Sequence, residues 1–273
     1  MEIGEALKTE RIRLGLTQDE MIKGIITKGH YSKIERGIEG ISAESLFKIL
    51  FANHIDADDF LNLIKDTYSL KEDIKAAKLN AQMRHAFDHL DHKQAKKYLN
   101  QILLLEDHRV LKYQSVISVT MFEVQLERLS SKFKNEIIQE FTGHNNWKEN
   151  IDSIRLLGNC MQVFSIEQLD YFVQELVDHY SEKSCFSEKL IERVAIVCNN
   201  YLYYCYYFQV KGKKVDVCLK FLKGLDDRMH FMFYRIASYF YGYLFEGKKD
   251  KARQLKDRLI TWGYGQRVLS WKI

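Results

Sequence analysis

The sequence predicts an all-α fold, with five short N-terminal helices followed by a superhelix of helical hairpins. The chain of 273 residues has no proline and only 14 glycines, a composition that favours long helices over a turn-rich sheet. Apolar residues recur at helical spacing along most of the chain. The sequence contains no apolar run of about 18 residues that could span a membrane, and its N-terminal segment is charged. We therefore expect a cytoplasmic protein without a membrane partner.

The first 65 residues divide into five helices, which we take as one domain. The first carries an apolar stripe and ends at Gly15; its members are Ile3, Ala6, Leu7, Ile12 and Leu14. Thr17 and Glu20 have the spacing of a capping box, which begins a second helix that Gly24 ends. A third helix begins after Thr27 and ends at Gly37. Ser42 and Asp56 cap a fourth and a fifth helix, and the charged segment 65–73 holds the domain boundary.

Residues 66–273 form a second domain of paired helical patterns. The pairs are 73–90 with 92–106, 108–130 with 132–141, 148–163 with 165–182, 187–210 with 213–224, and 227–246 with 248–262. The tripeptide Gly-Lys-Lys at Gly212 recurs at Gly247, 35 positions later. A period of about 34 residues is typical of tetratricopeptide (TPR) arrays, whose concave faces commonly bind peptides. An irregular helical bundle is the alternative.

The segment from Leu16 to Gly37 has the pattern of a helix-turn-helix. Tyr31 and Ile34 are three residues apart and point inward, so a polar and basic face of the third helix is left outside. Residues 8–36 contain seven basic and four acidic side chains, a net charge of +3. Double-stranded DNA is the partner that such a helix fits. Because the charge excess is small, we expect a dimer on a two-fold site.

This segment resembles the DNA-binding domain of the XRE/lambda-repressor family. The matching residues are Arg11, Leu16-Thr17-Gln18, Glu20 and Ser32-Lys33-Ile34-Glu35-Arg36-Gly37. The resemblance implies that Gln18 contacts phosphate, that Arg36 lies near the DNA backbone, and that Arg11 forms a partly buried ion pair with Glu35. The predicted DNA-binding residues are Gln18, Thr27, Lys28, Gly29, His30, Ser32, Lys33 and Arg36.

The combination of an XRE domain with about 200 residues of helical repeats resembles the Rgg/GadR/MutR regulators. That resemblance implies a homodimeric transcription regulator whose repeat domain binds a short hydrophobic signalling peptide and whose C-terminal helices contribute to the dimer. Contact with RNA polymerase would fit such a role. Asparagine suits a peptide backbone because its side chain carries a donor and an acceptor, and aromatic faces suit apolar side chains. The candidate peptide-binding residues are Arg155, Asn159, Asn199, Tyr203, Tyr207, Arg235 and Tyr239.

No motif for catalysis or for a cofactor is present, so we expect neither an enzyme nor a resident metal. Two other interpretations remain open. One is a helical-repeat scaffold for protein interactions. The other is a metal- or redox-responsive regulator that uses His85, His89 and His92, which share one side of a helix, or the five cysteines. The cysteines are Cys160, Cys185, Cys198, Cys205 and Cys218; we expect reduced, mostly buried thiols, with Cys198 and Cys205 on one helix face.

Overall fold

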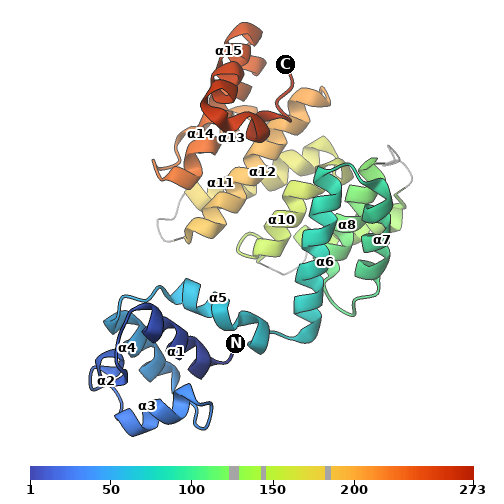
Figure 1. The fold of residues 1–273 in the computed structure, drawn as a ribbon. Helices are drawn as coiled ribbons and strands as arrows, with labels where there is room; N and C mark the ends of the chain where they lie inside the picture. The colour runs from blue at the N-terminus through green and yellow to red at the C-terminus, as the bar shows by residue number, and fades with distance from the viewer. Residues whose placement is uncertain (123–128, 143–145, 182–185) are drawn as a thin grey trace. The chain divides into compact units, whose positions relative to one another are not determined.

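The computed structural model describes residues 1–122, 129–142, 146–181 and 186–273. Within these ranges the secondary structure is helical and contains no strand, which confirms the predicted all-α class. The chain forms two compact units, residues 1–81 and 82–273 (Figure 1). The helix α6 (Lys71–Asp88) contains the division between them.

The first unit contains the five predicted helices and the start of α6. The helices are α1 (Ile3–Arg13), α2 (Gln18–Ile22), α3 (Lys28–Glu35), α4 (Ala43–Ala52) and α5 (Ala57–Tyr68). The predicted N-caps at Thr17, Thr27, Ser42 and Asp56 are all present, because each side chain accepts a backbone N–H bond in the first turn of its helix. The charged segment 65–73 is almost entirely helical, since α5 continues to Tyr68 and α6 begins at Lys71.

A small apolar core holds these helices together. Its buried members are Ala6, Leu7, Met21, Ile22, Tyr31, Ile34, Leu46, Ile49, Leu50, Ile55, Phe60 and Ile64. The prediction that Ile12 and Leu14 belong to the apolar stripe of α1 is wrong, because they are 61% and 37% exposed. Ile12 lies about 240° around the helix from Ala6, and Leu14 follows the last helical residue. The α1 surface that packs on α3 contains Gly4, whose missing side chain permits close backbone contact.

The second unit contains the end of α6 and the remaining helices, and two of the predicted pairs, 187–210 with 213–224 and 227–246 with 248–262, are confirmed by contacts between their helices. The remaining helices are α7 (His92–Leu103), α8 (Arg109–Phe122), α9 (Ser131–Thr142), α10 (Ile151–Asn159), α11 (Ile166–Ser181), α12 (Glu188–Tyr207), α13 (Val215–Lys223), α14 (Met229–Phe245) and α15 (Lys249–Leu259). Short segments η2 (Met161–Val163), η3 (Ile260–Tyr264) and η4 (Gly265–Val268) complete the helical structure described. Part of the predicted helix 108–130 lies outside the described residues.

Hairpins in this unit stack on one another. The first helices of successive hairpins, α8, α10, α12 and α14, contact each other in that order, and the second helices α11 and α13 are also in contact. Within the last two hairpins, α12 packs on α13 and α14 packs on α15 (Figure 1). This order of contacts is that of stacked helical repeats, in which each unit packs on its neighbours.

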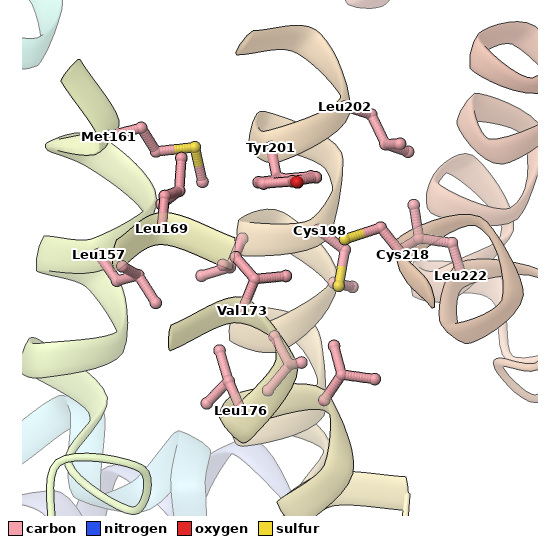
Figure 2. Packing of buried hydrophobic residues seen from close by; sticks show 14 of the residues in the cluster. Leu157, Met161, Leu169, Val173, Leu176, Cys198, Tyr201, Leu202, Cys218 and Leu222 are labelled. Atoms are coloured by element: carbon pink, nitrogen blue, oxygen red, sulfur yellow. The ribbon is translucent and has the colours of Figure 1, made fainter. Parts of the chain in front are cut away.

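A continuous apolar core runs between the stacked hairpins. Figure 2 shows part of it, where Leu157, Val173 and Leu202 come from three successive helices. The first Gly-Lys-Lys turn is bonded to this core: the buried Asp170 carboxylate accepts the N–H of Lys213 at 3.0 Å and the hydroxyl of Tyr201. The Tyr201 oxygen in turn accepts the N–H of Lys214 at 3.1 Å. The turn before α13 is therefore held by side chains from α11 and α12.

None of the helices in the described ranges is long and apolar enough to cross a bilayer.

Candidate functional site

Helices α2 and α3 form a helix-turn-helix whose second helix exposes a basic face. Lys23 and Gly24 follow α2 in left-handed conformations, with φ of 46° and 76°, so the helix ends next to Gly24 as the sequence predicts. Tyr31 and Ile34 are buried, as their spacing predicts. The Lys28 and Lys33 side chains are 62% and 48% exposed. The two ammonium groups are therefore accessible from solvent.

Each of these two lysines forms an ion pair with an acidic residue from outside α3. Lys28 Nζ lies 2.5 Å from Asp19 Oδ2 of α2, and Lys33 Nζ lies 2.6 Å from Glu39 Oε1. Glu39 also approaches the ring of His30, with 3.5 Å between its Oε2 and His30 Nε2. The hydrogen bond from Lys33 lowers the pKa of Glu39 below its ordinary value. Glu39 is not among the residues predicted from the sequence. Its position six residues after Lys33 and just beyond Gly37 could have indicated this contact, because a glycine at the end of a helix commonly reverses the chain.

Behind this face, Arg11 and Glu35 form the ion pair that the family resemblance implies. Arg11 Nε lies 2.6 Å from Glu35 Oε1, and the two side chains are only 15% and 4% exposed. The Gln18 amide donates to the same carboxylate at 2.9 Å. Burial opposes ionisation of Glu35, but the bonds from Arg11 and Gln18 outweigh it and lower its pKa. The network connects α1, α2 and α3. Gln18, which the resemblance implies as a phosphate contact, therefore also has a partner within the protein.

The other predicted DNA-binding residues lie on the same two-helix segment. Thr27 caps α3 by accepting the N–H of His30 at 3.3 Å. Arg36 follows α3, is exposed, and donates to the Ser32 carbonyl at 3.2 Å. Gly29 is exposed, and a side chain added there would meet no atom within 4 Å. Their contact with DNA stays a prediction.

The candidate peptide-binding residues lie on the three stacked first helices. Arg155 and Asn159 are on α10, Asn199, Tyr203 and Tyr207 on α12, and Arg235 and Tyr239 on α14. These helices contact each other consecutively. The structure thus gathers the candidates on neighbouring elements that are far apart in sequence.

Their local contacts differ. Asn159 is exposed and Tyr203 is half-buried, with its ring 4.4 Å from that of Tyr207. Tyr207 already donates its hydroxyl to the backbone carbonyl of Lys272 in the C-terminal segment. Tyr239 contacts α13 instead, where Lys223 Nζ lies 5.4 Å from its ring centre.

Two polar contacts between the stacked helices were not foreseen. Asn200, next to the predicted Asn199, donates to the Gly158 carbonyl of α10 at 3.0 Å. Tyr234 of α14 donates to Glu192 of α12 at 3.2 Å. Sequence spacing places all these residues on helices but does not say which helix faces which.

Two of the histidines stack on each other, and four of the cysteines are buried. The rings of His85 and His89 stack with 4.1 Å between their centres, and the described residues contain no group of three or more potential metal ligands. Cys160, Cys198, Cys205 and Cys218 are buried free thiols, while Cys185 lies outside the described residues. Figure 2 shows the sulfur of Cys198 next to that of Cys218, on α13. Burial raises the pKa of Cys205 to about 11.

No family model and no curated protein matches this sequence. Solved structures do match it over almost the whole length. A Listeria monocytogenes protein assigned as a transcriptional regulator is 18% identical with a TM-score of 0.74, and the match covers 96% of this chain and 92% of that one. The SHP pheromone receptor Rgg2 of Streptococcus dysgalactiae is 18% identical with a TM-score of 0.68, over 98% of both chains. PrgX in complex with cCF10 is 15% identical with a TM-score of 0.68, over 98% of this chain and 89% of that one. The chain therefore has the fold of the Rgg and PrgX regulators, a helix-turn-helix unit followed by stacked helical hairpins.

Proposed function

We propose that this protein is a sequence-specific DNA-binding transcription regulator. The observation that carries the proposal is the outer face of α3, where Lys28 and Lys33 extend into solvent while Tyr31 and Ile34 anchor the helix. A recognition helix needs this division, because it must be held firmly by its own domain while its polar side chains reach base edges. In this proposal Ser32 and Lys33 face bases, and Gln18 and Arg36 face the phosphate backbone.

The regulator acts as a homodimer on a two-fold operator. One helix-turn-helix with few uncompensated cations binds DNA weakly, and a second copy doubles the contacts. A group of apolar side chains near the C-terminus is exposed and supports a dimer contact there. Its members are Ile260 at 48%, Trp262 at 63%, Tyr264 at 42% and Leu269 at 69% exposure. Exposed apolar surface of this kind commonly marks a protein contact.

A short hydrophobic peptide controls the regulator by binding to the stacked first helices of the second unit. The support is the fold shared with a pheromone receptor and with a peptide pheromone/receptor complex, together with the polar and aromatic side chains on α10, α12 and α14. Asn159 and Asn199 would bond the peptide backbone, and Tyr203 would hold an apolar side chain. Peptide binding shifts the population of dimer arrangements and so changes how two recognition helices match the operator.

The DNA-binding part is tested by selecting duplexes from a random-sequence pool with the full-length protein. Lys33→Ala should relax base preference at one position of each half-site, whereas Gln18→Ala should weaken binding to all sequences. Lys48→Ala is the matched control, because Lys48 is an exposed lysine of the same unit that pairs with Glu44 on α4. Failure of the wild-type protein to enrich any duplex would reject the proposal, as would equal effects of the Lys33 and Lys48 variants.

The peptide-binding part is tested separately with a pool of synthetic hydrophobic peptides and the same full-length protein. Bound peptides are recovered after size-exclusion chromatography and identified by mass spectrometry. Asn199→Ala should reduce recovery, and Asn100→Ala serves as a control because it makes the same change at an exposed asparagine of α7 in the same unit. Recovery that is equal for wild type and the Asn199 variant would reject the assignment of that residue.

A further inference from the structure

The acidic partners of the recognition-helix lysines have a direct consequence for DNA binding. Asp19 pairs with Lys28 and Glu39 pairs with Lys33, and all four side chains are between 40% and 62% exposed. The carboxylates therefore stand at the same surface as the ammonium groups. Any duplex that approaches Lys28 or Lys33 also approaches Asp19 or Glu39.

The backbone fixes the position of Glu39. Gly37, with φ of 71°, reverses the chain at the end of α3. The N–H of Ile38 bonds to the Lys33 carbonyl and that of Gly37 bonds to the Ile34 carbonyl, both at 2.9 Å, which is a Schellman motif. His30 Nε2 lies 3.3 Å from the Gly40 carbonyl on the same turn. Glu39 is thus held beside Lys33 by local structure on both sides.

Asp19 is fixed in a similar way. It lies in the first turn of α2, whose start is held by the capping box of Thr17 and Glu20. Its carboxylate meets Lys28 in the first turn of α3. Asp19 therefore belongs to α2, which precedes the turn, and Lys28 belongs to α3, which follows it.

Phosphate contacts and base contacts respond differently to these carboxylates. Nonspecific binding consists mainly of contacts from lysine and arginine to phosphates. A phosphate that contacts Lys28 or Lys33 comes close to the carboxylate partner, which carries the same charge and repels it. A base edge carries no net charge. A lysine ammonium has three donors, so it can bond guanine O6 or N7 while a carboxylate remains its partner, and a carboxylate can itself accept from the cytosine amino group.

We infer that Asp19 and Glu39 set the ratio of specific to nonspecific DNA binding, by penalising phosphate contacts of Lys28 and Lys33 more than base contacts. The inference rests on the proposed function, because it concerns the same DNA-binding surface. It names two specificity-determining residues that do not themselves need to touch DNA.

The experiment compares Asp19→Asn, Glu39→Gln and the double variant with wild-type full-length protein. The control is Glu44→Gln, which removes the same charge from an exposed ion pair with Lys48, 2.5 Å apart, on α4. Each protein is titrated with two fluorescent duplexes of equal length, one enriched by the wild type from a random pool and one of random sequence. Titrations are repeated over a range of salt concentrations.

Glu39→Gln should raise affinity for the random duplex about 1.4- to 5-fold, the range that an exposed ion pair commonly contributes. Its plot of log affinity against log salt should steepen by about 0.9 for each additional phosphate that the protein neutralises. Affinity for the enriched duplex should change less, so the specificity ratio falls, most in the double variant. Glu44→Gln should leave the ratio unchanged.

Two results would overturn the inference while leaving the proposed function intact. One is a specificity ratio in the Glu39 and Asp19 variants that equals that of the Glu44 control, although Lys33→Ala still alters base preference. The other is weaker binding of the Glu39 variant to both duplexes, which would mean that Glu39 only positions Lys33. If the wild type enriches no duplex, the inference falls together with the proposed function.

Discussion

Replacing Gly4 with alanine tests how closely α3 packs on α1. An alanine Cβ at this position would lie 1.9 Å from the carbonyl oxygen of Ile34 and 2.8 Å from its carbon. These are backbone atoms of α3, so no side-chain rotation relieves the overlap. The two helices would have to separate by about 1.5 Å, because ordinary contact begins at 3.4 Å. The displaced element is the helix that carries Lys28 and Lys33.

The expected loss of stability follows from two opposing effects. Overpacking commonly destabilises a protein by about 1–3 kcal/mol, and a backbone overlap belongs near the upper limit. Alanine in a helix is about 1 kcal/mol more favourable than glycine. The first unit should therefore lose about 2 kcal/mol, which corresponds to a roughly 30-fold fall in hydrogen-exchange protection of amides that open with that unit.

The assay is hydrogen exchange of the full-length chain, read by mass spectrometry on peptides from residues 28–36. Trp147, Trp262 and Trp271 all belong to the second unit, so tryptophan fluorescence in urea reports that unit separately and should be unchanged. Gly29→Ala is the matched control, because a Cβ there meets no atom within 4 Å. It should raise stability by about 0.5–1 kcal/mol. Equal protection in the Gly4 and Gly29 variants would refute the close packing of α1 on α3.

Three further predictions concern other contacts. Because the folded-state pKa of Glu35 is lowered from 4.5, its ionised form stabilises the first unit above that pH. This contribution should be lost as the pH falls below about 4.5. Glu35→Gln should therefore make hydrogen-exchange protection of the first unit depend less on pH in this range. Gly212→Ala should destabilise the second unit by about 1–3 kcal/mol in urea unfolding followed by fluorescence, because its Cβ would lie 2.2 Å from the bonded Tyr201 hydroxyl. Burial raises the pKa of Cys218 and of Cys160, so iodoacetamide should label these thiols only in unfolded protein, as measured by peptide mass spectrometry.

Each of these predictions has a contradicting result. If hydrogen-exchange protection of the Glu35→Gln variant fell with pH as it does in the wild type, the pair of Glu35 with Arg11 would not be the source of that pH dependence. Gly242→Ala is the control for Gly212→Ala, because a Cβ at Gly242 meets no atom within 4 Å. Equal urea midpoints of the two variants would show that the turn at Gly212 accommodates the added methyl group without loss of stability. Fast native labelling of Cys218 would mean that α12 and α13 open readily.

Local chemistry in the sequence predicted most of the helix boundaries. The capping residues Thr17, Thr27, Ser42 and Asp56 each bond to the amide three residues away, so their effect depends on neighbours that the sequence already displays. The last two hairpins, α12 with α13 and α14 with α15, followed from helical periodicity and from the recurrence of Gly-Lys-Lys. The exposed face of α3 followed from the spacing of Tyr31 and Ile34.

Contacts between distant segments were decided by the tertiary structure. The peptide-binding candidates illustrate this: Tyr207 bonds the carbonyl of Lys272, 65 residues away, and Tyr239 contacts Lys223 on another helix. The bonds from Asp170 to Tyr201 and Lys213 span 31 and 43 residues. No periodic pattern encodes which helix lies against which.

The sequence by itself determined where helices begin, which side of each is apolar in most cases, and that the third helix presents lysines outward. The folded structure decided which acids neutralise those lysines, since Asp19 reaches Lys28 from α2 and Glu39 reaches Lys33 after Gly37 reverses the chain. It also decided that Ile12 is exposed, because the core side of α1 is chosen by its packing on α3 and α5. The physical reason is range: caps and periodicity act within a few residues, whereas ion pairs and packing depend on distances that only the folded chain sets.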